Sequence, residues 1–111
     1  MCIRDSAYID PQTEVLEMAV LDVKENQTDE FVAAFKQAQS IIISMQGYIH
    51  HSLSKCLERK NRYLLLVNWH TLEDHTVGFR ESLEYQEWKS LLHDFYDPFP
   101  SVEHFQTVEL T

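Results

Sequence analysis

Glycine and cysteine are both scarce in this sequence of 111 residues. The two glycines, Gly47 and Gly78, cannot supply a GxGxxG or GxxxxGK[ST] loop, in which backbone amides hold nucleotide phosphates. The two cysteines, Cys2 and Cys56, lack CxxC spacing, which argues against both a disulfide framework and a thiolate metal site. The composition therefore disfavours nucleotide cofactors and predicts a reducing compartment.

Basic residues and long apolar runs are scarce as well. Nine basic against 18 acidic residues give a net charge of -9, so the attraction that draws proteins to nucleic acids and anionic membranes is missing. The apolar runs, such as residues 41–43 and 64–67, are far shorter than the roughly 20 residues that span a bilayer. We predict a cytoplasmic protein with no nucleic-acid partner and no membrane partner.

The chain length fits one domain that buries a core of its own. We expect residues 1–12 to be a disordered or artefactual leader, because they show no periodicity, and residues 13–111 to form the domain. Hydrophobic spacing, turns and caps predict the elements. In chain order they are a strand over 14–23, a helix whose N-cap is one of residues 26–28 and that ends before Gly47, strands over 48–57 and 62–69, a short helical piece capped by Thr71, a helix capped by Ser82, and a strand over 102–110. This βαββαβ order is typical of the α+β ferredoxin-like fold, a four-stranded antiparallel sheet with both helices on one face.

The strand over 62–69 is apolar on both of its faces. Because side chains alternate along a strand, one face carries Tyr63, Leu65, Val67 and Trp69, and the other carries Leu64, Leu66 and Asn68. The helices can cover only one face. Burial of each leucine is worth roughly 1.5–3 kcal/mol, and a second copy of the sheet is the simplest cover for the other face. We therefore predict a homodimer with its sheets face to face.

Several segments match a known pattern in their order and spacing: the first strand, Gly47-Tyr48-Ile49, the run from Leu64 to Trp69, and His75 to Ser82 followed by Tyr85 and Trp88. Over residues 14–110 the sequence resembles the antibiotic biosynthesis monooxygenase family. The resemblance implies a dimeric α/β barrel with a pocket between sheet and helices in each subunit. Some members of that family oxidise phenolic or quinol-like substrates with dioxygen and without metal or flavin. Others bind and break down haem, and many have no known activity.

The sequence departs from both active patterns. The haem-degrading pattern has an asparagine on the first strand and a histidine late in the second helix. This sequence has no asparagine on that strand and Lys89 near the histidine position, so haem is the less favoured alternative. The phenol-oxidising pattern has an asparagine four residues before the tryptophan and a tyrosine six after it, where this sequence has Leu65 and His75. The identity of the substrate therefore does not follow from the resemblance.

Trp69 and His75 are the first candidates for a site. The Trp69 indole would form a flat apolar wall of the pocket and offer one N–H donor to an aromatic substrate, although a core tryptophan fits the pattern equally well. His75, with an ordinary pKa near 6.5, would accept a phenolic proton, which eases electron transfer to dioxygen. A capping or surface histidine is the alternative for His75.

His50 and His51 are adjacent on a strand and must face opposite sides of the sheet. A simple four-residue hairpin loop pairs His50 with Trp69, whereas a one-residue slip or a bulge puts His51 on the pocket side instead. The resemblance favours His51, because relatives keep the histidine of a Gly-Tyr-Ile-x-His pattern. Either histidine can also be only a polar strand residue.

The remaining candidates are apolar or lack a recognisable pattern. The predicted substrate-binding residues are Phe79, Trp88, Leu65 and Val67. Arg80 could orient an acidic group of the substrate. His93 and His104 flank a proline-rich turn, but their spacing matches no known ligand pattern, so we predict no metal site.

These features support three functional hypotheses. The first is a monooxygenase without a cofactor that acts on a small aromatic substrate, with His75, Trp69 and His51 as its catalytic residues. The second is a non-catalytic dimeric protein that binds a small apolar metabolite or acts in a stress response. The third is haem binding or breakdown.

Overall fold

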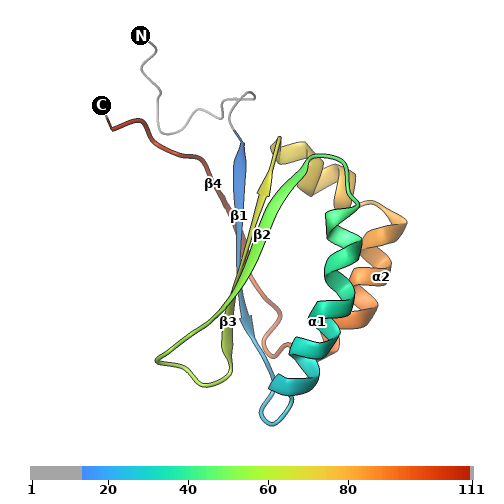
Figure 1. The fold of residues 1–111 in the computed structure, drawn as a ribbon, viewed down its shortest axis with the longest axis vertical. Helices are drawn as coiled ribbons and strands as arrows, with labels where there is room; N and C mark the ends of the chain where they lie inside the picture. Colours follow the sequence, from blue (N-terminus) through green and yellow to red (C-terminus); the bar gives the residue numbers. More distant parts are fainter. Residues whose placement is uncertain (1–13, 111) are drawn as a thin grey trace.

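The computed structural model describes residues 14–110, so the predicted leader over 1–12 lies outside the described residues. Its elements in chain order are β1 (Val15–Asp22), α1 (Thr28–Ile43), β2 (Tyr48–Lys55), β3 (Arg62–Trp69), a π-helical segment η1 (Asp74–Phe79), α2 (Leu83–Leu92), a 3₁₀ segment η2 (His93–Phe95) and β4 (Val102–Phe105). The strands form one antiparallel sheet in the order β2-β3-β1-β4, and α1 and α2 lie on the same side of it (Figure 1). The predicted ferredoxin-like α+β fold is confirmed, as an open sheet that does not close into a barrel within one chain.

The strands at the centre of the sheet, β1 and β3, alternate between buried and half-buried residues along their whole length. Such alternation shows that one face of the sheet packs against the helices, because successive side chains point to opposite faces. The helices supply the other half of the core. Their buried residues are Phe31, Phe35, Ala38 and Ile42 on α1 and Trp88 and Leu92 on α2.

The predicted helix caps at Thr71 and Ser82 are confirmed, and the last strand ends earlier than predicted. The Ser82 hydroxyl accepts a hydrogen bond from the Tyr85 N–H at 3.0 Å, and the Thr71 hydroxyl accepts one from the Asp74 N–H at 3.1 Å. The N-cap of α1 is Gln27, whose side chain makes no capping bond. β4 ends at Phe105, five residues before the predicted boundary, where it pairs with Leu16, the second residue of β1.

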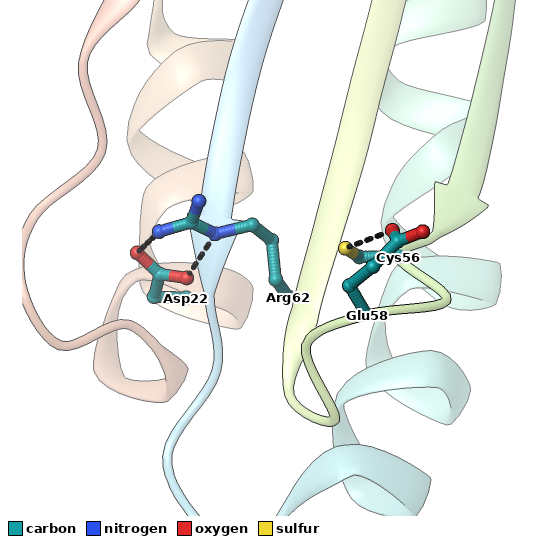
Figure 2. A network of polar contacts seen from close by, with 4 residues as sticks. All are labelled: Asp22, Cys56, Glu58 and Arg62. Atoms are coloured by element: carbon teal, nitrogen blue, oxygen red, sulfur yellow. Dashed lines mark hydrogen bonds and ion pairs between the residues drawn. The ribbon is translucent and has the colours of Figure 1, made fainter.

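An ion pair joins β1 and β3 at one end of the sheet (Figure 2). Arg62 donates two hydrogen bonds to the Asp22 carboxylate, from Nε at 2.8 Å and from Nη2 at 3.1 Å, and the two residues are direct partners in the ladder. These bonds hold the pKa of Asp22 below its usual value. In the adjoining hairpin the Cys56 thiol donates to Glu58 at 3.7 Å. About a third of each side chain in the ion pair is exposed, so the pair contributes under about 1 kcal/mol to the free energy of unfolding. Its main effect is to favour the observed register of β1 and β3.

The turn between α1 and β2 depends on Gly47. Its φ is +84°, which L-residues with a Cβ rarely adopt, and a Cβ at this position would overlap the side chain of Asp74. The Gly47 carbonyl also accepts a hydrogen bond from the His70 N–H at 2.8 Å, which ties the turn to the end of β3.

We expect Gly47→Ala to lower the free energy of unfolding by about 2–4 kcal/mol, since backbone strain and steric overlap add together. Urea denaturation of the purified variant measures this loss. Gly78→Ala is the matched control, because the nearest atom to a Cβ there is 3.7 Å away and the change should stay within about 1 kcal/mol. Equal stability of the two variants would contradict the role assigned to the turn.

The face of the sheet opposite the helices is apolar at its centre. We call it the open face, and its central residues are Leu16, Met18, Val20, Leu64 and Leu66. These five side chains are half-buried in the single chain, and Met18 pairs with Leu66 while Val20 pairs with Leu64 across the ladder. No helix of the described chain covers this face. Among residues 14–110, no helix is both long and apolar enough to cross a membrane.

Candidate functional site

A cavity of about 330 Å³ lies between the helix-covered face of the sheet and α2. Aromatic rings dominate its walls, and most of its polar groups come from β1, η1 and the segment after α2. The residues used below that line it are Glu17, Leu65, His75, Phe79, Arg80, Tyr85, Trp88, His93 and Tyr96. Such a space, largely apolar with a few placed polar groups, is typical of a small-molecule site.

A carboxyl group is buried on the wall of this cavity. Glu17 lies in the middle of β1 on the helix-covered face, with Val67 of β3 on one side and His104 of β4 on the other in the two ladders. The residue is 6% exposed. Its Oε1 accepts a hydrogen bond from the Trp69 indole N–H at 2.9 Å. Trp69 therefore holds the carboxyl group in place from the neighbouring strand.

His75 lies above this carboxyl group and contacts it directly. The ring belongs to η1, is 2% exposed, and stacks on Trp69 with 5.3 Å between ring centroids and 21° between ring planes. Its Nε2 is 3.3 Å from Glu17 Oε1, and its Nδ1 is 2.7 Å from His104 Nε2. Both ring nitrogens of His75 thus have partners within the protein.

Burial shifts the pKa values of this pair in opposite directions. Loss of water raises the pKa of Glu17 to about 7, against the smaller opposing effects of the Trp69 hydrogen bond and the Arg80 charge. Burial lowers the pKa of His75 to about 3, and the charges of Arg80 and His104 add to this effect. At neutral pH His75 is therefore neutral, and the carboxyl group is the member of the pair that gains or loses a proton.

The structure brings most of the predicted site residues to this cavity, but not all of them. His75, Phe79, Trp88 and Leu65 line it. Trp69 and Val67 are fully buried behind the wall, so Trp69 gives its N–H to Glu17 and does not present a face to the cavity. Trp69 is therefore not among the residues that line the cavity, and its contact with a substrate stays a prediction.

His51, and not His50, lies on the helix-covered face of the sheet. The hairpin loop is one residue longer than the simple four-residue loop, because Lys55 pairs with Tyr63 and the Cys56 N–H donates to the Arg62 carbonyl. His51 therefore pairs with Val67, and a bulge lies between Tyr48 and His50. His51 contacts the Tyr48 hydroxyl and, at 2.9 Å, the side-chain oxygen of Gln39 on α1. These bonds hold His51 between β2 and α1, and it is not among the residues that line the cavity.

The sequence did not lead us to assign Glu17 to the site, and His104 was considered only as a possible metal ligand. Glu17 occupies the buried phase of β1, between Val15 and Ala19 in the alternation, where a charged residue is unusual. A glutamate at a buried position of a strand could have been predicted to be functional from the sequence. His104 carried no such signal, because its contact with His75 depends on how η1 packs on the sheet. Among residues 14–110, no group of three metal-binding side chains is arranged to hold an ion.

The fold and the site together define a class of protein: a small α+β domain with an aromatic-lined cavity and a carboxyl–imidazole pair on its wall. Residues 15–91 match the family model of antibiotic biosynthesis monooxygenase. The chain is 65% identical to the uncharacterized protein YczJ of Bacillus subtilis over 94 residues, which cover 85% of this chain and 99% of YczJ. The chain belongs to the antibiotic biosynthesis monooxygenase family.

Solved structures agree with this assignment. A Bordetella bronchiseptica protein of the same family superposes with a TM-score of 0.84 at 32% identity, covering 88% of this chain and 100% of that chain. SnoaB, a cofactor-independent oxygenase from Streptomyces nogalater, superposes with a TM-score of 0.65 at 17% identity, covering 89% of this chain and 95% of SnoaB. At that identity the likeness to SnoaB establishes the fold alone.

Proposed function

We propose that this protein is a monooxygenase that needs no cofactor and oxidises a small phenol or quinol in the 330 Å³ cavity. The observation that carries the proposal is the buried Glu17–His75 pair on an aromatic-lined wall. A phenol must lose its proton before it gives up an electron readily, and a carboxyl group with a pKa near 7 is well matched to that task.

Within this proposal Glu17 is the proton acceptor and His75 is its partner. Both ring nitrogens of His75 are engaged, by Glu17 and by His104, so a substrate hydroxyl would have to displace one of them. The Glu17 carboxyl group lines the cavity as His75 does, and it is the member of the pair whose pKa lies near 7. The sequence-based hypothesis that His75 takes the proton directly is therefore modified: the pair takes it, and the proton is first accepted by the carboxylate.

The reaction balances without any further reagent. The phenol O–H transfers its proton to Glu17, and the phenolate transfers one electron to dioxygen. The resulting phenoxyl radical, whose unpaired electron is shared with the ring carbons, combines with superoxide by forming a C–O bond. Loss of the hydrogen on that carbon and cleavage of the O–O bond give a quinone and a water molecule. One oxygen atom of dioxygen thus enters the product, and the other leaves as water.

We further propose that the working unit is a homodimer that pairs the open faces of two sheets. The central residues of that face are apolar, and an exposed apolar patch of this kind is costly in a monomer. A twofold contact covers the same patch on both subunits and closes the assembly.

Oxygen uptake by the EDTA-treated protein tests the function. We expect added hydroquinones, dihydroxynaphthalenes or anthrones to be consumed with one dioxygen per quinone formed, and heat-unfolded protein to be inactive. Binding of these compounds without oxygen uptake would contradict the monooxygenase and favour a binding protein. A shifted Soret band on titration with haem, again without quinol oxidation, would favour the haem alternative.

A further inference from the structure

A chain of three polar side chains leads from the cavity to the edge of the sheet. It runs from Glu17 Oε1 to His75 Nε2 at 3.3 Å, and from His75 Nδ1 to His104 Nε2 at 2.7 Å. Glu17 and His104 are direct partners in the β1–β4 ladder, so they emerge side by side on the helix-covered face, and His75 bridges them from above. His104 is half-buried and belongs to β4, an edge strand of the sheet.

The contacts of this chain determine where its protons sit when Glu17 is ionised. The carboxylate only accepts: it receives the Trp69 N–H, and its charge, 3.3 Å from His75 Nε2, favours the His75 tautomer that carries its proton on Nε2. His75 then has a lone pair on Nδ1 and accepts from His104, whose Nε2 must carry a proton. The second nitrogen of His104, Nδ1, is left as an acceptor.

The same contacts favour the opposite arrangement when Glu17 is protonated. With the proton on the carboxyl group, the His75 nitrogen that faces it, Nε2, is the one without a proton, so the proton of His75 is on Nδ1 and is donated to His104 Nε2. His104 then carries its own proton on Nδ1. Each histidine has exchanged one tautomer for the other, and both remain neutral in both states.

We propose that His104 is the proton-uptake and proton-release group of this site, and that it acts on Glu17 through His75. A proton that arrives at His104 Nδ1 releases the Nε2 proton to His75 Nδ1, and His75 releases its own Nε2 proton to Glu17. Every step breaks one N–H bond and forms one N–H or O–H bond, so the net result is one proton delivered to the carboxylate. In reverse, the chain carries the proton of a substrate out of the cavity.

The charged neighbours favour transfer through neutral rings. Arg80, at the end of η1, lowers the pKa of Glu17, His75 and His104 alike, and burial is the larger cause of the lowered pKa of both histidines. The other titratable groups on the cavity wall are Tyr85 of α2, His93 of η2 and Tyr96, none of which supplies a nearby negative charge that would hold an imidazolium. A cationic histidine is therefore disfavoured along the chain, whereas an exchange of tautomers keeps each ring neutral.

Nitrogen NMR of ¹⁵N-histidine protein without substrate tests this proposal independently of the proposed function. We expect His75 and His104 to exchange tautomers together in one transition near neutral pH. In Glu17→Gln, which has no ionisable group at this position, both rings should keep one tautomer across that range. Separate midpoints for the two rings, or a transition that persists in Glu17→Gln, would overturn the proposal.

Turnover provides a second test, which does rest on the proposed function. We expect His104→Gln to lower kcat at least tenfold and to change KM less than twofold, because glutamine keeps a hydrogen bond to His75 but cannot relay a proton. His104→Ala should regain most of its kcat on addition of free imidazole. His70→Gln, a change at an exposed histidine beyond β3, is the matched control and should leave kcat unchanged.

The two tests separate the two proposals. If His75 and His104 exchange tautomers together but the protein oxidises no phenol, the proposed proton path is supported and the proposed monooxygenase activity is contradicted. Full activity of His104→Gln with the pH profile of the original protein would overturn the role of His104, even if the monooxygenase is correct. Should His104→Ala fail to fold, His104→Gln and the NMR transition still decide the matter.

Discussion

Glu17→Gln is expected to lower the rate of quinol oxidation by about 100-fold or more and to make the folded protein more stable above pH 7. The amide of glutamine can still accept the Trp69 N–H and contact His75, but it cannot accept a proton from the substrate. Loss of a positioned general base typically costs a factor of about 10² to 10⁴. The same change removes a carboxylate that is costly to bury.

The effect on stability has a defined sign. The pKa of Glu17 rises from 4.5 in the unfolded chain to about 7 in the folded one, so the folded protein binds this proton more tightly. Stability is highest below pH 4.5 and falls as the pH rises to 7, by about 3 kcal/mol for this group alone. Relative to the original protein, Glu17→Gln should therefore gain about 3 kcal/mol at pH 8 and much less at pH 5.

Denaturation with urea at pH 5 and pH 8, together with oxygen uptake, measures both effects. Glu14→Gln removes the same charge from an exposed position just before β1 and serves as the control, with unchanged activity and a stability within about 0.5 kcal/mol. If Glu17→Gln kept full activity, the carboxyl group would not be the base. If its stability relative to the original protein were independent of pH, Glu17 would not have the raised pKa on which the proposal depends.

Leu66→Glu is expected to convert the dimer into a monomer. Leu66 lies at the centre of the open face and pairs with Met18 on one side and Ser52 on the other. A charge that is solvated in the monomer would have to be buried without a partner in the dimer, which typically costs more than 3 kcal/mol per subunit contact. The dissociation constant of the dimer should therefore rise by at least about 100-fold.

Light scattering coupled to size-exclusion chromatography measures this change. Leu83→Glu introduces the same residue at the exposed first turn of α2, where the leucine is 86% exposed, and should leave the mass unchanged. A monomeric original protein would contradict the proposed dimer, as would a dimeric Leu66→Glu variant. Retention of quinol oxidation by the monomeric variant would show that the cavity of one chain suffices.

The apolar content of the segments predicted the strands, and the alternating direction of side chains along a strand predicted their faces. Along β3 the four residues predicted to face the helices, Tyr63 to Trp69 in steps of two, are all buried. Local rules succeed here because periodicity and capping act between residues close in sequence. They did not determine the register of β2, where a hairpin loop one residue longer than the simple one pairs His50 with Asn68, and a bulge follows between Tyr48 and His50. The energy difference between neighbouring registers depends on contacts with the whole sheet.

The site was predicted less completely than the fold. The sequence pointed to His75, Phe79, Trp88 and Leu65, which do line the cavity, and the composition disfavoured nucleotide cofactors. Trp69 was assigned to the cavity wall, yet its indole N–H is used to hold a carboxyl group that no motif indicated. The sequence shows that Trp69 has one N–H donor, but the acceptor of that hydrogen bond, Glu17, lies on another strand and is identified only in the structure.

The sequence by itself determined the order of the elements, the buried face of each central strand and the resemblance to a family, because these follow from local periodicity and spacing. Only the tertiary structure decided that Glu17, His75 and His104 meet, since they come from β1, η1 and β4, 58 and 29 positions apart along the chain. It also decided their pKa values, because removal of water from a side chain depends on everything that packs around it. The proposed chemistry therefore depends on tertiary packing and could not be predicted from the sequence alone.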